Sequence, residues 1–172
     1  GGPSVFPPLP AGVAALSYAN NLKWNTSKNA DRYRRGMYTF FKRTSPHPNL
    51  TAFDCPDSNV TCVKRSRSNT PLAALATLNN SVFAEAAKAM AKRVIKEKPD
   101  DASRIELCFR LCVARPPTPD EHAAFAGLLK SAREYYRSHK PEAKAYNGNP
   151  EASTWAATAR IMLNMDEFIT RE

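Results

Sequence analysis

Apolar positions recur at helical spacing through the second part of the chain, from residue 71 onward. In residues 102–114, the apolar side chains fall on one side of a helix, because positions three and four apart share a face. Similar stripes predict a packed set of about five helices. The first predicted helix covers residues 71–78, and the second begins at Ser81 with the apolar face Val82, Phe83, Ala86, Ala87, Met90 and Val94. The third covers residues 102–114, with the face Ile105, Cys108, Phe109 and Cys112. The fourth covers residues 119–138, with Phe125, Leu128, Leu129 and Tyr136, and the fifth covers residues 151–165, with Trp155, Ala159 and Met162.

Capping residues mark where these helices begin. The sequence TPDE at residues 118–121 combines an N-cap threonine, a proline in the first turn and a glutamate three residues after the cap, which is a capping box. The sequence NTP at residues 69–71 predicts a helix start at about Pro71, and Ser81 is expected to cap the next helix. Residues 147–150, NGNP, predict a turn, and residues 166–172 are expected to add one short turn.

The first 70 residues show no comparable periodicity. Prolines and glycines crowd the first ten positions and favour an extended or polyproline II segment. Residues 14–24 could form a strand, residues 32–42 are predicted to form a helix with a strand as the alternative, and residues 45–49 a loop. The predicted fold class is mainly α, with an irregular, Pro-rich N-terminal segment and at most a small sheet before the packed helices. Residues 1–172 are expected to be a single domain, or the C-terminal portion of a larger one.

The chain is basic, with 25 Lys and Arg against 16 Asp and Glu and a formal net charge of +9. Residues 1–70 hold ten basic residues against three acidic ones, whereas residues 71–172 hold fifteen against thirteen. This excess makes an anionic polysaccharide a candidate partner. Nucleic acid is not indicated, since no zinc-finger, RNP-type or bZIP pattern occurs, and no apolar run of about 18 residues predicts a membrane span. The candidates for an anion-binding face, or alternatively for internal ion pairs, are Arg34, Arg35, Arg43, Arg65 and Arg67.

Four cysteines are candidates for a disulfide or a metal site. A bridge between Cys55 and Cys62 across the Pro-containing loop is geometrically easier than one between Cys108 and Cys112, which lie one helical turn apart. The latter pair has apolar neighbours and is expected to be buried. We expect no metal site, because C-x6-C followed much later by C-x3-C does not match the paired spacing of zinc modules. No C-x-x-C-H haem motif occurs, so no cofactor is expected on this chain.

No common catalytic motif is present: the sequence lacks G-x-S-x-G, G-x-x-x-x-G-K-[ST] and H-E-x-x-H. The three histidines, His47, His122 and His139, are expected at the surface. Asp54 is the remaining catalytic candidate, because a carboxylate beside Arg65 and Arg67 could be desolvated. The alternative is a structural salt bridge, in which Asp54 stays ionised and makes a poor general acid. The two acidic residues at 166–167 are expected to make helix-end contacts or to be solvated.

Several ordered motifs resemble one known family. They are GGPSVFP at the start, DRYRRGMYTFFKRTSPHPNLTAFDCPDSNVTCVKRSRSNTPLAALATLNN, RPPTPDE and MLNMDEFITRE. Together they resemble the C-terminal part of the planctomycete-type domain of unknown function 1553. The resemblance implies an exported protein, periplasmic or extracellular, whose relatives often carry a cytochrome-like domain, and a chain that starts inside its domain. Export in turn favours the bridge between Cys55 and Cys62.

Three functional hypotheses follow. The first is a non-catalytic structural and interaction domain that docks on the upstream part of its own protein or on a cytochrome-like partner. The second is part of an extracellular enzyme of polysaccharide or redox metabolism, with a pocket around Arg34, Arg43, Asp54 and Arg65. The third is a module that binds anionic glycans through the basic first part, with an affinity that falls steeply with salt.

Overall fold

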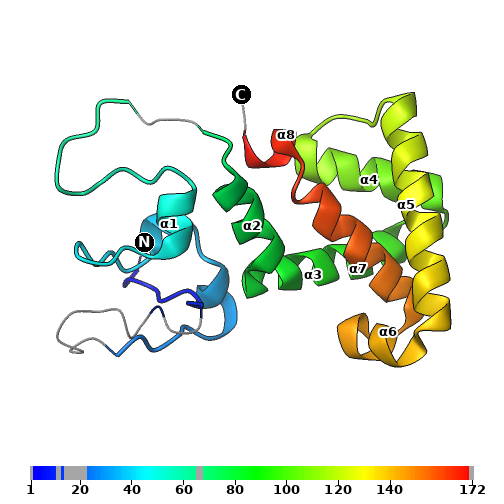
Figure 1. Cartoon of the computed structure of the whole chain (residues 1–172), viewed down its shortest axis with the longest axis horizontal. Coiled ribbons are helices and arrows are strands. Elements are labelled where there is room, and N and C mark those ends of the chain that lie inside the picture. Colours follow the sequence, from blue (N-terminus) through cyan, green and yellow to red (C-terminus); the bar gives the residue numbers. More distant parts are fainter. Residues whose placement is uncertain (1, 11–12, 14–22, 65–67, 171–172) are drawn as a thin grey trace. The chain divides into compact units, whose positions relative to one another are not determined.

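The computed structural model describes residues 2–10, 13, 23–64 and 68–170, and it is mainly α-helical, as predicted (Figure 1). The chain divides into two compact units: unit 1 is Gly1–Ala76 with Asn80–Val82, and unit 2 is Thr77–Asn79 with Phe83–Glu172. Among the described residues, β-structure is confined to one isolated parallel bridge between Val5 and Thr39. None of the described helices is long and apolar enough to cross a membrane.

Unit 1 is organised around that bridge. The backbone N–H of Val5 donates to the Tyr38 carbonyl at 2.8 Å, and the Val5 carbonyl accepts from the N–H of Phe40 at 2.8 Å. The bridge brings the Phe6 ring onto the Phe40 ring, with centroids 5.1 Å apart, and Trp24 packs edge-on against Phe6 at the same distance. The GGPSVFP and RRGMYTF motifs are therefore one structural unit, although more than 30 residues separate Val5 from Tyr38.

The predicted helix over residues 32–42 is wrong. The segment instead holds two 3-10 turns, Asn29–Tyr33 (η2) and Gly36–Tyr38 (η3), separated by extended backbone at Arg34 and Arg35. Extended backbone from Thr39 onward exposes N–H groups to the Val5 carbonyl, and pairing with Val5 outweighs the local helical spacing. The strand considered for residues 14–24 lies mostly outside the described residues.

The loop predicted over residues 45–49 ends in a short helix, α1 (Pro48–Ala52), with proline at its first position. Its N-cap is His47, whose Nδ1 accepts a hydrogen bond from the N–H of Asn49 at 3.2 Å. The prediction of a surface histidine is wrong here, because only 3% of His47 is exposed.

Seven further helices follow within the described residues 68–170, and five of them match the predicted set. They are α2 (Pro71–Asn79), α3 (Ser81–Glu97), α4 (Asp101–Val113), α5 (Pro119–Ser138), α6 (Lys140–Asn147), α7 (Pro150–Met162) and α8 (Asp166–Ile169). The capping box at Thr118 and Glu121 is confirmed, with both reciprocal hydrogen bonds formed. The cap predicted at Ser81 is wrong: the Asn80 side chain accepts from the N–H of Val82 at 2.8 Å, which places the cap one residue earlier. The sequence did not predict α6.

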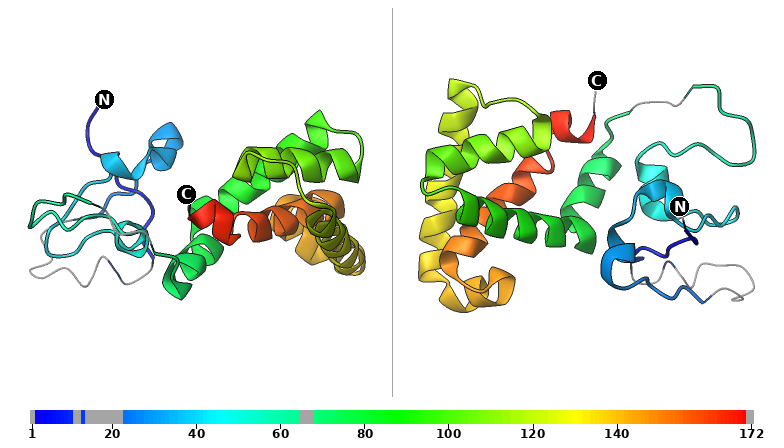
Figure 2. Two further views of the ribbon diagram at one scale, coloured as in Figure 1. Left: turned by 90° about the horizontal axis from the view of Figure 1, so that it is seen from above. Right: turned by 180° about the vertical axis from the view of Figure 1, so that it is seen from behind.

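Helix α7 lies at the centre of unit 2 and packs against α4, α5 and α6 (Figures 1 and 2). Its buried alanines and threonines are small, while Trp155, which is 1% exposed, is among the largest fully buried side chains of the described residues. The four residues predicted to face one way on α4 are all buried. On α3 the predicted stripe is partly wrong: Ala86 is exposed, and Ala91 is buried in its place between Ala87 and Val94.

Arg133 of α5 joins the first turns of α4 and α7. Its guanidinium donates to both carboxylate oxygens of Asp101, at 2.9 and 3.0 Å, and to both of Glu151, at 2.9 and 2.7 Å. Glu151 also accepts from the Trp155 indole N–H at 3.1 Å. The two carboxylates, in turn, raise the pKa of Arg133. The network fixes the first turns of α4 and α7 against α5 beside the buried tryptophan.

We expect Arg133→Met to lower the free energy of unfolding by about 1–3 kcal/mol, since it removes four charge-assisted hydrogen bonds from a half-buried site. Urea unfolding followed by far-ultraviolet circular dichroism measures the change. The matched control is Arg93→Met, because Arg93 of α3 forms one exposed ion pair, with Glu97 of the same helix α3. Such a pair contributes about 0.3–0.5 kcal/mol. Equal effects of the two substitutions would contradict the proposed importance of the network.

Candidate functional site

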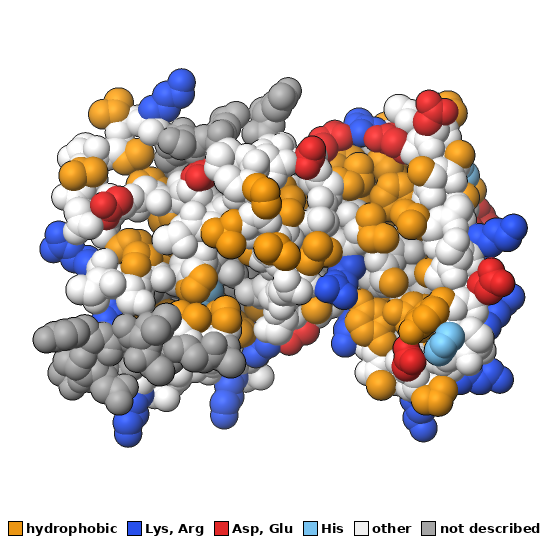
Figure 3. Space-filling model, viewed as in Figure 1, with side chains coloured by type: hydrophobic (Ala, Val, Ile, Leu, Met, Phe, Trp, Pro, Cys, Tyr) orange, Lys and Arg blue, Asp and Glu red, His pale blue; other side chains and the backbone are white. Residues whose placement is uncertain are grey.

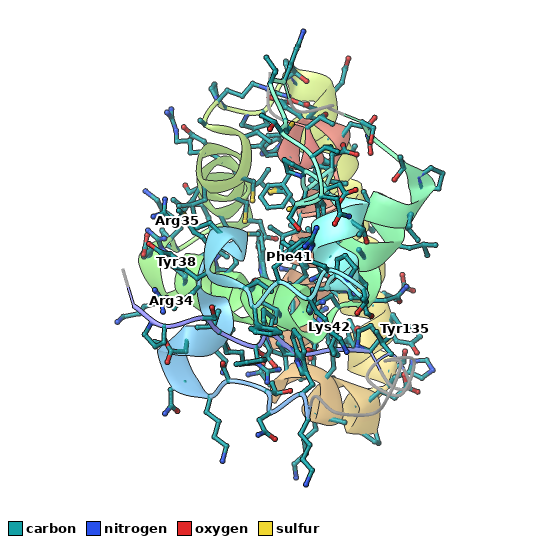
Figure 4. The ribbon with its side chains drawn as sticks, turned by 90° about the vertical axis from the view of Figure 1, so that its left-hand side faces the viewer. Arg34, Arg35, Tyr38, Phe41, Lys42 and Tyr135 are labelled. Atoms are coloured by element: carbon teal, nitrogen blue, oxygen red, sulfur yellow. The ribbon has the colours of Figure 1, made fainter. Side chains whose placement is uncertain are left out.

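Two of the five arginines predicted for an anion-binding face, Arg34 and Arg35, lie beside the Tyr38 ring. The Arg34 guanidinium lies 4.0 Å from the centre of the Tyr38 ring and donates to the Pro3 carbonyl at 3.2 Å, and the Arg35 guanidinium lies 5.9 Å from the same ring. Figure 4 shows these three labelled side chains together, with Arg34 and Arg35 from the backbone between the two 3-10 turns and Tyr38 from η3. Arg34 is thus held by internal contacts, whereas Arg35 is exposed.

Arg43 and Asp54 each form hydrogen bonds with a neutral side chain. Arg43 donates through Nε and Nη2 to the Asn59 amide oxygen, at 3.0 and 2.8 Å. The Asp54 carboxylate accepts from the Ser68 N–H at 2.8 Å and from its hydroxyl at 2.8 and 3.0 Å. Arg34, Arg43 and Asp54 thus contact different side chains, and the pocket predicted for the enzyme hypothesis stays a prediction. Arg65 and Arg67 lie outside the described residues, so their ion pair with Asp54 stays a prediction.

The four cysteines are free thiols in the structure, and the bridge between Cys55 and Cys62 stays a prediction. Cys62 is exposed, and its thiol donates to the Lys64 carbonyl at 3.4 Å. Cys108 and Cys112 are buried, as expected, with 1% and 6% of their surface exposed. Burial raises the pKa of Cys108 to about 12 and that of Cys112 to about 11, so both are protonated thiols at neutral pH.

His47 has a defined protonation pattern. Because Nδ1 accepts from Asn49, the proton resides on Nε2, which donates to the Pro8 carbonyl at 3.2 Å. Burial of the ring lowers its pKa from the usual 6.5. Of the other two histidines, His139 is exposed, as expected, and His122 is half-buried.

We expect unit 1 to lose stability as the pH falls below 6.5, because the unfolded chain then binds a proton at His47 that the folded unit does not. One proton gives a slope of at most about 1.4 kcal/mol per pH unit. The measurement is an NMR titration of the His47 ring in the native chain and in the same chain unfolded by urea. His47→Asn, which keeps a capping side chain, should remove this pH dependence. A His47 pKa in the native chain that is equal to or above its pKa in the unfolded chain would refute this prediction.

A second charge cluster of unit 2 is centred on Arg115, two residues after the end of α4. Left-handed backbone at Ala114, with φ of 60°, ends the helix there. Arg115 then donates to Glu121 at 2.7 and 2.8 Å and to Glu167 of α8 at 2.5 and 2.9 Å. Hydrogen bonds from Arg115 lower the pKa of Glu121 to about 2. Sequence reasoning missed this cluster. Its local signal was an arginine three residues before the N-cap Thr118 of the capping box, but the other partner of this arginine, Glu167, lies 52 residues away from it.

A pocket of about 800 Å³ lies beside this cluster, between the end of α4 and α8. Its lining combines the apolar end of α4 with acidic and polar residues of α8: Leu111, Cys112, Val113, Ala114, Asp166, Glu167 and Thr170. Figure 3 shows apolar surface on unit 2 with acidic side chains along its upper edge. The carboxylates of Asp166 and Glu167 line the α8 side of this pocket and form what we call its acidic rim. We call this place the α4–α8 pocket.

The described residues offer no assembled metal site of the usual kind, since no three His, Cys, Asp or Glu side chains among them form a suitable group. The fold and the site thus define a helical domain in which Arg115 and Arg133 join separate helices of unit 2. Residues 1–129 match the PSD1 family, described as a protein of unknown function (DUF1553). The match covers 129 of 172 residues, so the chain belongs to this family, and the resemblance seen in the motifs is confirmed. No curated protein and no solved structure matches the chain.

The family match ends inside α5, at Leu129, whereas the core of unit 2 continues to Leu163. The MLNMDEFITRE motif, which includes Glu167 of the α4–α8 pocket, lies beyond the matched span. The end of the match therefore does not mark the end of the folded unit.

Proposed function

We propose that the chain is a non-catalytic interaction domain of an exported protein, and that its α4–α8 pocket holds a protein segment with a basic and an apolar side chain. The upstream part of the same protein or a cytochrome-like partner would supply this segment. The observation that carries the proposal is the pocket itself, in which the apolar end of α4 meets an acidic rim.

The chemistry of the pocket supports docking more than catalysis. Glu121 and Glu167 are committed to Arg115, and Cys112 is a protonated thiol. Such groups are poor general acids, bases or nucleophiles at neutral pH. In contrast, Leu111 is 39% exposed on the apolar wall, where a partner's apolar side chain would cover it. A lysine or arginine on the same segment would complement the acidic rim.

Site-specific photo-crosslinking in the full-length protein tests the proposal. A benzophenone amino acid replaces Leu111, and in the control it replaces Tyr135, which is 46% exposed and does not line the pocket. We expect position 111 to link to one mapped segment that contains a basic residue beside an apolar one, and the charge reversal Asp166→Lys to abolish the link. Equal yields at the two positions, or linked segments without basic residues, would overturn the proposal.

Binding of an anionic glycan by unit 1 is a second candidate function. It is favoured by Arg43, whose guanidinium contacts a neutral amide, so this contact leaves its charge uncompensated. Retention on heparin should fall steeply with salt and should weaken in Arg35→Ala/Arg43→Ala. The control Lys92→Ala/Lys96→Ala removes the same charge from α3. Equal retention of both double variants would show that net charge alone causes binding.

A further inference from the structure

Three sulfur-bearing side chains meet between α3 and α4. Cys108 and Cys112 lie four residues apart on the inner face of α4, and the Cys112 thiol contacts the Met90 sulfur of α3 at 3.7 Å. The two cysteine side chains are close enough that a charge on Cys112 raises the pKa of Cys108. Positions four apart on a helix bring Cβ atoms to about 5–6 Å, which allows both sulfurs to reach one atom between them.

The donor atoms of this cluster are all soft. Two thiolates and a thioether suit Cu(I) among biological metals, since soft sulfur ligands select this ion and carboxylate or carbonyl oxygens do not. Zn²⁺ is a poorer fit, because structural zinc sites use four ligands. The thiol and thioether sulfurs, 3.7 Å apart, are spaced as two ligands of one small ion would be.

The cluster also has an entry path. Cys112 is both a member of the cluster and a lining residue of the α4–α8 pocket, which opens to solvent. An ion that enters the pocket reaches Cys112, which contacts the half-buried Met90, and the more deeply buried Cys108 lies one helical turn away. A path of this kind is required of any buried metal site.

We propose that Cys108, Cys112 and Met90 form a binding site for one soft monovalent cation, Cu(I), which enters through the α4–α8 pocket. Binding forms two metal–thiolate bonds and one metal–thioether bond and breaks two S–H bonds. The two thiols release two protons to solvent, and no electron is transferred. This inference does not depend on the proposed docking function, because it rests on the sulfur cluster.

Silver(I) is the probe, because it has the same ligand preference as Cu(I) without its redox chemistry. The full chain carries Cys55→Ser and Cys62→Ser, so that the other two thiols do not compete. Native mass spectrometry in chloride-free, oxygen-free buffer should show one silver ion per chain with the loss of two protons. Since two protons leave, the affinity should rise by about 100-fold per pH unit below the thiol pKa values.

Two variants on that background identify the ligands. Cys112→Ser should weaken silver binding by about 100-fold or more, beyond the roughly 10–100-fold that loss of an outer-shell partner costs. Met90→Leu nearly conserves volume and should keep the fold, verified by circular dichroism, yet weaken binding by about 10-fold. Unchanged affinity in Met90→Leu, the loss of one proton or none, or no stoichiometric binding by the background chain would each overturn the proposal.

Discussion

A chain that ends at Leu129, where the family match ends, is expected to lose the fold of unit 2. This truncation removes half of α5 and all of α6, α7 and α8. The buried residues Ile105 and Phe109 of α4 would then lose the α7 side chains of the same core cluster. Each large side chain that returns to water costs about 1.5–3 kcal/mol, so a few of them exceed the stability of an ordinary domain.

Far-ultraviolet circular dichroism and urea titration measure the effect of this truncation. The control is a chain that ends at Met165, which lacks α8 but keeps α7 and the complete core cluster. We expect this control to unfold cooperatively at a lower urea concentration than the full chain, since it lacks the Glu167 pair and the Phe168 contact. Cooperative unfolding of the chain that ends at Leu129 would show that the matched span folds by itself.

Trp155→Ala is expected to lower the free energy of unfolding of unit 2 by about 3–5 kcal/mol. Trp155 is among the largest fully buried side chains of the described residues, and its indole N–H donates to Glu151 within the Arg133 network. The substitution therefore leaves a cavity in the core and removes a hydrogen bond at the same time. Urea unfolding followed by circular dichroism at 222 nm measures the difference.

Ile161→Ala is the matched control for this prediction. Ile161 lies on the same helix and is 43% exposed, so its loss should change stability by at most about 1 kcal/mol. Comparable effects at positions 155 and 161 would mean that α7 is not the centre of the core. A large effect at Trp155 alone would support that placement.

The sequence predicted most accurately where a short stretch contains the whole physical reason for a structure. The TPDE segment places an acceptor, a proline and a carboxylate within four residues, and α5 begins there as expected. The spacing of Ile105, Cys108, Phe109 and Cys112 likewise identified the buried face of α4. Helix α6 was missed because Lys140–Asn147 is mostly polar, and Ala143 is its one buried residue.

Long-range pairing explains the errors in unit 1. Aromatic residues at helical spacing in the segment 32–42 indicated a helix, but the backbone there pairs with Val5 instead. The position of His47 between two prolines indicated a surface residue. Its ring centroid instead lies 5.7 Å from that of Trp24, and its Nε2 forms a hydrogen bond with the Pro8 carbonyl. The partners of both features lie far away in the sequence, so local patterns give no sign of them.

The same limit applies to the candidate sites: the sequence identified candidate residues but not their contacts in the structure. From sequence alone, Asp54 and the basic residues were candidates, and the structure gives Asp54 a serine partner and Arg34 a tyrosine partner. The α4–α8 pocket was not foreseen, because Arg115 and Glu167 come together only when α8 folds back on α4.

By itself, the sequence determined the family, the mainly α fold class and the starts of the strongly capped helices, because these depend on motifs and on interactions within a few residues. The tertiary structure alone decided the central place of α7, the burial of His47, the meeting of Met90 with Cys112 and the charge cluster around Arg115. Each of these depends on side chains from distant segments, whose contacts form only when hydrophobic burial packs the helices together.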